Sequence, residues 1–163
     1  MSKKIKFEYR RKREGKTNYK RRLALLKSRK DRLVIRKTNN YLIAQIVRYE
    51  PDGDKVLVSA NSKELQKLGW KNSCKNIPAS YLTGLILGKK ASEKKIKEAI
   101  VDLGLQTPIK GSRLYSLIKG VVDSGMSVPA SEDVFPPKER LTGSHISDKI
   151  SKEFETLKNK LAK

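Results

Sequence analysis

The chain has 163 residues, enough for one domain with extensions, and its 38 Lys and Arg outnumber 17 Asp and Glu to give a net charge of +21. Charge of this size repels itself in a compact state, so we expect a polyanionic partner, namely nucleic acid. The longest apolar stretch is too short to span a bilayer, no secretory signal is present, and the single Cys74 excludes an intrachain disulfide. We therefore expect a soluble cytoplasmic protein with no membrane partner.

The positive charge is concentrated at the N-terminus. Residues 1–37 hold 17 basic and 3 acidic residues, a net charge of +14, whereas residues 38–163 carry only +7. Two-thirds of the excess charge thus lies in less than a quarter of the chain, which predicts that this segment contacts the polyanion.

The first 30 residues form a basic N-terminal arm and a helix in our interpretation. Residues 1–16 carry too few apolar groups to fold alone. Thr17 or Asn18 can cap a helix in which Tyr19, Leu23 and Leu26 share one face, so we expect this stripe to dock on the domain while cations point outward.

Three antiparallel strands are expected next. Leu33 and Ile35 face one way, opposite to Arg32, Val34 and Arg36. Residues 41–49 are rich in β-forming residues, residues 51–54 read as a turn, and residues 56–58 return as the hairpin partner.

The following segments alternate helix and strand. We expect a helical turn at 62–68, a helix at 77–91, a strand at 99–103 and a helix at 112–124 capped by Ser112. This order predicts an α/β fold, a βββαβα sandwich with a mixed sheet, over residues 31–125. Residues 126–163 are expected to form an extended linker and tail with a short helix at 146–161.

Two further groups of residues have open interpretations. Lys110-Gly111-Ser112-Arg113 at a helix N-terminus forms either a phosphate site or an ordinary cap with surface charges. Trp70 beside Lys71 could stack on a base, but a core or partner contact explains it equally well.

Glycines and titratable residues argue against catalysis. Gly84 and Gly88 predict close packing of a helix on the sheet, and no phosphate-loop spacing accompanies them. One His and one Cys cannot make a zinc site, and among the strands only one carries a carboxylate, Asp102. We therefore expect that the chain is not an enzyme and that it binds no cofactor and no metal ion.

Several blocks in order resemble one family. Residues 10–19 (RRKREGKTNY), 32–47 (RLVIRKTNNYLIAQIV), 59–71 (SANSKELQKLGWK), 79–88 (ASYLTGLILG) and 99–125 (AIVDLGLQTPIKGSRLYSLIKGVVDSG) are similar to large-subunit ribosomal protein eighteen in its archaeal form, the universal 5S rRNA binder. The likeness spans roughly residues 5–145. At residues 29–32 the chain has Arg-Lys-Asp-Arg where the family has a turn of the Gly-Lys-Pro-Arg type.

The resemblance implies a βββαβα domain docked on 5S rRNA in the central protuberance. It also implies contacts to large-subunit rRNA and to a neighbouring 5S-binding ribosomal protein, and we expect no homo-oligomer. The RNA contacts that it implies are Arg10, Arg11, Arg13, Lys16, Asn18, Tyr19, Arg22, Arg36, Lys37 and Asn39.

Charge and position add further candidates to that set. They are Lys3, Lys4, Lys6, Lys12, Arg21, Lys27, Arg29, Lys30, Arg32, Trp70, Lys71, Lys110, Ser112 and Arg113. The leading hypothesis is a structural ribosomal protein that anchors 5S rRNA. An RNA-processing nuclease and a DNA-compacting basic protein are the alternatives.

Overall fold

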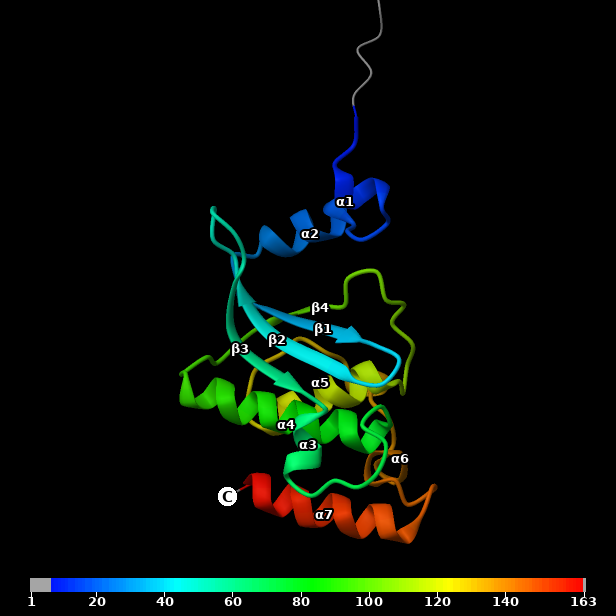
Figure 1. Cartoon of the computed structure of the whole chain (residues 1–163). Helices are drawn as coiled ribbons and strands as arrows, with labels where there is room; N and C mark the ends of the chain where they lie inside the picture. Colours follow the sequence, from blue (N-terminus) through cyan, green and yellow to red (C-terminus); the bar gives the residue numbers. More distant parts are fainter. Residues whose placement is uncertain (1–6, 163) are drawn as a thin grey trace, which may run out of the picture.

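The computed structural model describes residues 7–162, which form a four-stranded sheet with helices on both sides (Figure 1). The strands are β1 (Arg32–Lys37), β2 (Leu42–Arg48), β3 (Lys55–Asn61) and β4 (Ile100–Asp102). The helices are α1 (Arg10–Arg13), α2 (Tyr19–Leu26), α3 (Glu64–Lys67), α4 (Ile77–Glu93), α5 (Arg113–Asp123), α6 (Lys138–Thr142) and α7 (Asp148–Ala162), with a 3-10 turn η1 (Glu132–Val134).

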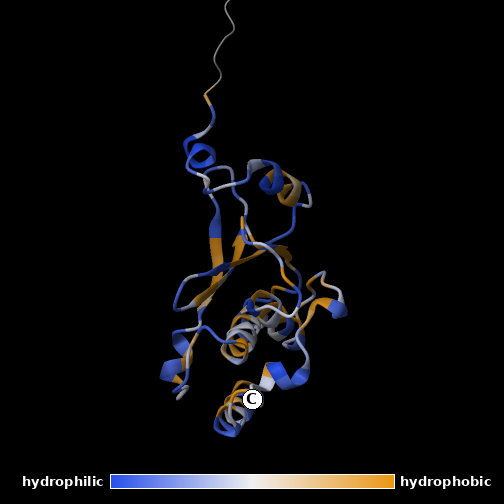
Figure 2. Cartoon of the chain, turned by 90° about the vertical axis from the view of Figure 1, so that its right-hand side faces the viewer, coloured by the Kyte–Doolittle hydropathy of each residue, from blue (hydrophilic) through white to orange (hydrophobic). Residues whose placement is uncertain are grey.

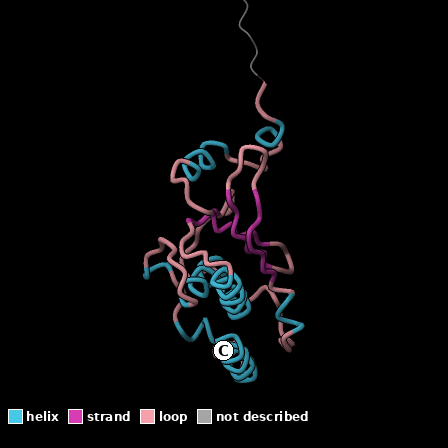
Figure 3. Tube along the Cα trace, turned by 90° about the vertical axis from the view of Figure 1, so that its left-hand side faces the viewer, coloured by secondary structure: helices cyan, strands magenta, loops and turns pink. Residues whose placement is uncertain are grey.

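The sheet has the order β3-β2-β1-β4, and its mixed character is confirmed. β1 and β2 pair antiparallel with Leu33 opposite Ile46, β2 pairs antiparallel with β3, and β4 lies parallel to β1 with Arg32 opposite Ile100. The expected alternation along β1 also holds, because Leu33 and Ile35 are fully buried. That inner face lies against α4 and α5, while the other face looks toward α2 (Figure 3).

Helices α4 and α5 approach each other unusually closely, and glycines allow it. A Cβ atom added to Gly84 would lie 2.2 Å from the carbonyl oxygen of Leu117, and one added to Gly120 would lie 2.2 Å from the carbonyl oxygen of Tyr81. A Cβ atom added to Gly88 would likewise clash, in this case with the side chain of Ser124. The expectation that Gly84 and Gly88 pack on the sheet is therefore wrong, because they serve a helix-on-helix contact.

Gly84→Ala should destabilise the protein, although alanine is the better helix former. The new methyl group meets backbone atoms of α5 that cannot rotate away, so we expect a loss of about 1 to 3 kcal/mol in the free energy of unfolding. Urea unfolding of both proteins measures it. A gain of about 0.5 to 1 kcal/mol, as helix propensity alone dictates, would contradict this packing.

The C-terminal region belongs to the same core. Residues 126–140 do not form an extended linker, since Met126 and Val128 are buried, Ser127 bridges to Glu98, and η1 and α6 follow. The C-terminal helix α7 forms close to where it is expected, and it buries Phe154 against Tyr81, with 5.5 Å between ring centroids. These burials could not be anticipated from a stretch rich in proline and polar residues.

The N-terminal helices stand apart from that core. Residues 10–13, expected as part of an irregular arm, form the single turn α1. Helix α2 is capped by Asn18, whose side chain accepts a hydrogen bond from the Arg21 N–H. None of the eight residues of α2, all of them described, is buried, and Leu23 is 58% exposed. The expected docking of an apolar stripe is therefore wrong. Figure 2 shows α1 as hydrophilic, in contrast to the hydrophobic sheet.

Candidate nucleic-acid interface

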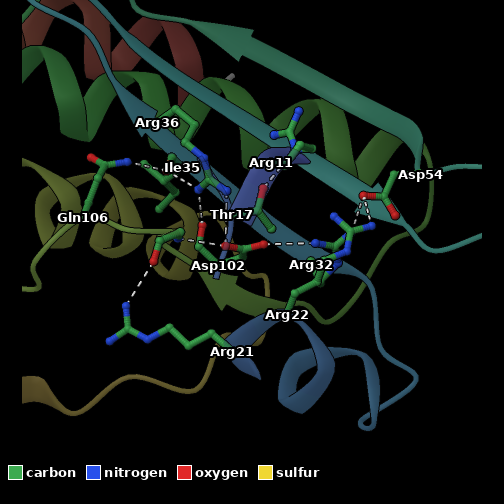
Figure 4. Close-up of polar contacts among 11 residues, drawn as sticks. Arg11, Thr17, Arg21, Arg22, Arg32, Ile35, Arg36, Asp54, Asp102 and Gln106 are labelled. Carbon is green, nitrogen blue, oxygen red and sulfur yellow. Dashed lines mark hydrogen bonds and ion pairs between the residues drawn. The ribbon is translucent and has the colours of Figure 1, made fainter. Parts of the chain in front are cut away.

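A groove of about 660 Å³ separates α2 from the outer face of the sheet. One wall is α2, with Arg21 and Arg22. The floor is the outer face of β1 and β2, and the far wall is the loop after β4. The lining residues of the loop are Leu103, Gly104, Leu105, Gln106 and Pro108. The groove is thus open to solvent and carries arginines on two sides (Figure 4).

The carboxylate of Asp102 holds the floor of the groove together. Arg32 Nη1 donates to its Oδ2 at 3.0 Å, and Arg36 Nη2 donates to its Oδ1 at 3.3 Å. The Gly104 N–H also donates to Oδ1, at 2.8 Å, and Arg36 Nη1 donates to the Asp102 carbonyl at 2.8 Å. Asp102 therefore fixes two arginines and the start of the loop, and its negative charge is neutralised by their guanidinium groups.

Polar contacts tie α2 to the sheet. Arg22 Nη2 lies 2.8 Å from Asp54 Oδ2, in the turn between β2 and β3, and Arg32 Nη2 lies 2.7 Å from the same oxygen. Arg21 Nη1 donates to the Gly104 carbonyl at 3.0 Å. Arg21 and Arg22 thus attach the helix at both sides of the groove. The sequence did not predict these partners, since Asp54 was interpreted only as a turn residue.

These contacts change the titration of Asp54. Burial by itself would raise the pKa of the Asp54 carboxyl, but the hydrogen bonds and positive charges of Arg32 and Arg22 outweigh burial and hold that pKa below its usual value. A folded-state pKa that is lowered means that the unfolded chain binds the proton more readily, so the carboxylate stabilises the fold above its unfolded pKa.

Asp54→Asn should accordingly lower the free energy of unfolding at neutral pH. The difference from the parent protein should shrink as the pH falls through the lowered pKa, because both proteins then lack the charge. Urea unfolding over a pH series measures the difference, with Asp52→Asn in the same turn as the control. A difference that persists in strong acid would refute an electrostatic role for Asp54.

Nine of the candidate cations lie on the N-terminal surface and are exposed. These residues are Arg10, Arg11, Lys12, Arg13, Lys16, Arg21, Lys27, Arg29 and Lys30. Some pair locally: Arg10 and Lys16 both contact Glu14, at 2.6 and 2.7 Å, and their hydrogen bonds lower the pKa of Glu14. Such exposed pairs contribute little to stability, so phosphates can replace them at small cost.

The turn from α2 into β1 departs from the Gly-Lys-Pro-Arg type of turn that the resemblance implied. Arg29 adopts the left-handed conformation, with φ of 56°, at the position where glycine is typical. Lys30 pairs with Glu98 at 2.6 Å, and Asp31 accepts two hydrogen bonds from Arg48, both at 2.9 Å. The turn is therefore held by ion pairs and adds the cation of Arg29 to the surface.

Other candidates lie farther away. Lys37, the last residue of β1, and Asn39, in the connection between β1 and β2, are both exposed and lie at the opposite end of β1 from Arg32. Lys71 and Lys110 are also exposed, but they lie outside both the groove and the N-terminal helices. Lys3, Lys4 and Lys6 fall outside the described residues.

The structure favours the core alternative for Trp70. Its indole is 2% exposed and donates to the Ser73 carbonyl at 3.2 Å, so it offers no ring face to a base. Arg32 is buried to a similar degree, with a side chain that is 3% exposed between Asp54 and Asp102. In this conformation Trp70 belongs to the core and Arg32 is held between two carboxylates, so neither reaches a ligand.

The segment Lys110 to Arg113 looks like an ordinary helix start. The Gly111 N–H donates to the Val134 carbonyl at 2.9 Å, and the Ser112 N–H donates to Ile109 at 3.2 Å. Arg113 donates to the Lys75 carbonyl at 2.9 Å. Ser112 lies at the cap position, but its buried hydroxyl makes no hydrogen bond with any described residue, which corrects the expected cap. The N–H groups of Gly111 and Ser112 are therefore already paired, whereas Lys110 stays exposed.

Two searches restricted to the described residues were negative. Between residues 7 and 162 no three His, Cys, Asp or Glu side chains gather in a way that could hold a metal ion. Over the same part of the chain, no helix is long and apolar enough to cross a membrane.

Comparison with known proteins shows what this chain is similar to. Residues 3–97 match a family described as "Ribosomal large subunit proteins 60S L5, and 50S L18". The chain is also 49% identical over 142 residues to the large ribosomal subunit protein uL18 of Korarchaeum cryptofilum, which covers 87% of this chain and 73% of that protein. The matched region includes α1, α2 and the first three strands, and the longer alignment leaves few residues unmatched.

Proposed function

Because this chain belongs to the family of ribosomal large subunit proteins 60S L5 and 50S L18, we propose that it binds 5S rRNA and helps to anchor it in the central protuberance. As a member of that family the chain is a structural protein of the large ribosomal subunit and not an enzyme. The proposal concerns which RNA it binds and with which residues.

One observation carries this proposal: α2 presents its cations on a helix that buries none of its eight residues. A helix that contributed to the core would be expected to bury its apolar side chains. Here Arg21 and Arg22 reach sideways to hold the helix over the groove, and Lys20 and Lys27 remain exposed. Such an arrangement is well suited to a phosphate backbone, which neutralises the charge and covers the helix.

The proposed contact surface is the exposed part of the expected set. It comprises Arg10, Arg11, Lys12, Arg13, Lys16, Asn18, Arg21, Lys27, Arg29, Lys30, Lys37 and Asn39, together with the half-buried Tyr19, Arg22 and Arg36. The N-terminal cations would neutralise phosphates, while the connection around Asn39 would recognise RNA shape. Lys3, Lys4 and Lys6 remain proposed on charge alone.

The proposal extends to two further partners, large-subunit rRNA and a neighbouring 5S-binding ribosomal protein. Residues 38–163 still carry a net charge of +7, and Lys71 and Lys110 lie exposed away from the N-terminal surface. A second RNA contact on this side would use them. In this proposed division residues 1–30 bind RNA, residues 31–125 form the α/β domain, and the C-terminal region from residue 126 follows it with buried Met126, Phe154 and Leu157.

The nuclease alternative is not favoured by the surroundings of Asp102. Its carboxylate faces the guanidinium groups of Arg32 and Arg36, whereas a metal-dependent nuclease needs carboxylates that share a cation. The DNA-compacting alternative differs from our proposal in specificity, and competition separates the two.

A competition experiment tests the proposed function. The full chain is bound to labelled 5S rRNA at physiological salt and challenged with unlabelled 5S rRNA, an unrelated RNA of equal length, or duplex DNA. We expect 5S rRNA to compete at much lower concentration than the other two, because shape recognition adds to the common phosphate term. Equal competition by duplex DNA would overturn the proposal.

A further inference from the structure

A second recess lies beside the groove, between the N-terminal helices and the loop after β4. Its volume is about 490 Å³, within the range of small-ligand pockets. The walls include Tyr9, Tyr19 and Leu105, and Lys12 and Lys20 also line it. Residues more than eighty positions apart in the sequence thus meet around one opening.

Apolar side chains are exposed at this recess. Tyr9 is 73% exposed and Leu105 is 52% exposed. The rings of Tyr9 and Tyr19 lie 5.2 Å apart between centroids and are inclined at 40°. Exposed apolar groups that gather on an otherwise hydrophilic surface are typical of a binding site, whereas apolar residues scattered singly are not.

The charge around the recess indicates what the apolar walls receive. Lys12 and Lys20 are both exposed, and the recess lies within a segment of net charge +14. An apolar side chain from a partner without acidic groups would gain nothing from these cations. An unpaired nucleotide satisfies both features, because its base stacks on aromatic faces while its phosphate binds lysine.

We propose that this recess takes one unstacked base of the bound RNA, held against Tyr9 and Tyr19 with Leu105 as the opposite wall. The inference rests on the proposed function and deepens it. The recess would recognise a single-stranded or bulged nucleotide, while the arginines of the neighbouring groove would bind phosphates. It also moves base stacking to the N-terminal surface, since Trp70 lies in the core.

Four single substitutions in the full chain test the proposal against a 5S rRNA transcript. Tyr9→Leu removes the aromatic face but keeps an apolar side chain, Tyr9→Phe keeps the face, and Leu105→Ala removes the opposite wall. Tyr49→Leu, at an aromatic residue that is 53% exposed and lines neither the groove nor the recess, is the matched control. Dissociation constants are measured over a series of KCl concentrations, and thermal melting confirms that each variant is folded.

We expect Tyr9→Leu to weaken binding by about fivefold or more, in line with the loss of one stacked base. The salt dependence should stay unchanged, because stacking releases no counterions. Tyr9→Phe and Tyr49→Leu should bind like the parent chain, and Leu105→Ala should be weakened.

Three results would overturn the inference. Equal binding by Tyr9→Leu and Tyr49→Leu would mean that no base enters the recess and that another occupant, such as a protein, covers it. Equal loss in Tyr9→Leu and Tyr9→Phe would assign the effect to the hydroxyl group. A shallower salt slope in Tyr9→Leu would assign it to phosphate contacts. In each case the parent chain still binds 5S rRNA, whereas failure of the proposed function would remove specific binding from the parent chain itself.

Discussion

A fragment that begins at Lys30 is expected to bind 5S rRNA far more weakly than the full chain and with a much shallower salt dependence. Residues 1–37 carry 17 of the 38 basic residues, and all but four of these 17 precede Arg29 or coincide with it. If about six cations in the deleted segment touch phosphate, the log–log slope of affinity against salt should fall by about 4 to 5.

The fragment should still fold, which makes this comparison informative. Neither α1 nor α2 contributes a buried residue, so their removal opens no cavity in the core. Arg22 leaves Asp54, but Arg32 stays within 2.7 Å of that carboxylate and still neutralises it. We therefore expect a cooperative thermal transition close to that of the full chain.

Titration of both chains with 5S rRNA across a range of KCl concentrations gives the two slopes. Some preference for 5S rRNA over an unrelated RNA should survive in the fragment, because Arg36 to Asn39 remain. Equal slopes would show that the N-terminal charge is merely solvated and that the α/β domain carries the RNA site.

The largest effect on stability is expected from Asp102→Ala. The substitution leaves the buried guanidinium of Arg32, 3% exposed, without one of its two carboxylates, and it also frees Arg36 and the Gly104 N–H. Removing one partner of a buried ion pair costs about 3 to 5 kcal/mol, and we expect the lower end because Asp54 still faces Arg32.

Urea unfolding measures this loss against Asp52→Ala, an exposed acidic residue in the turn before β3 whose removal should change stability by less than about 0.5 kcal/mol. If the two variants were equally stable, Asp102 could not be the residue that holds the floor of the groove. RNA binding by Asp102→Ala, measured on the folded fraction, should also weaken because Arg36 and the loop lose their support.

Much of the domain could be predicted because its elements carry local signals. Alternation at Leu33 and Ile35 defined the inner face of β1, and Asn18 marked the start of α2. The C-terminal region escaped prediction for a physical reason. Burial of Met126 and Val128 depends on a core made by distant segments, and nothing in their immediate neighbours signals it.

The candidate site was only partly predictable. The concentration of Lys and Arg in the sequence was enough to predict the basic N-terminal surface, because exposed cations do not depend on contacts with distant residues. The roles of Arg32, Asp54 and Asp102 depend on long-range pairing, so the sequence could not separate a buried arginine from an RNA contact. For α2, an apolar stripe suggested docking, but polar ties at Arg21 and Arg22 hold the helix away from the core.

The most direct test of the central claim is to identify the RNA that this chain binds in a native extract. Ultraviolet crosslinking, purification of the chain under denaturing conditions and sequencing of the attached RNA would report both the RNA and the crosslinked residues. We predict that 5S rRNA is the most enriched RNA and that crosslinked peptides come chiefly from residues 7–39. Enrichment of other RNAs without 5S rRNA, or crosslinks confined to residues beyond 39, would contradict the account.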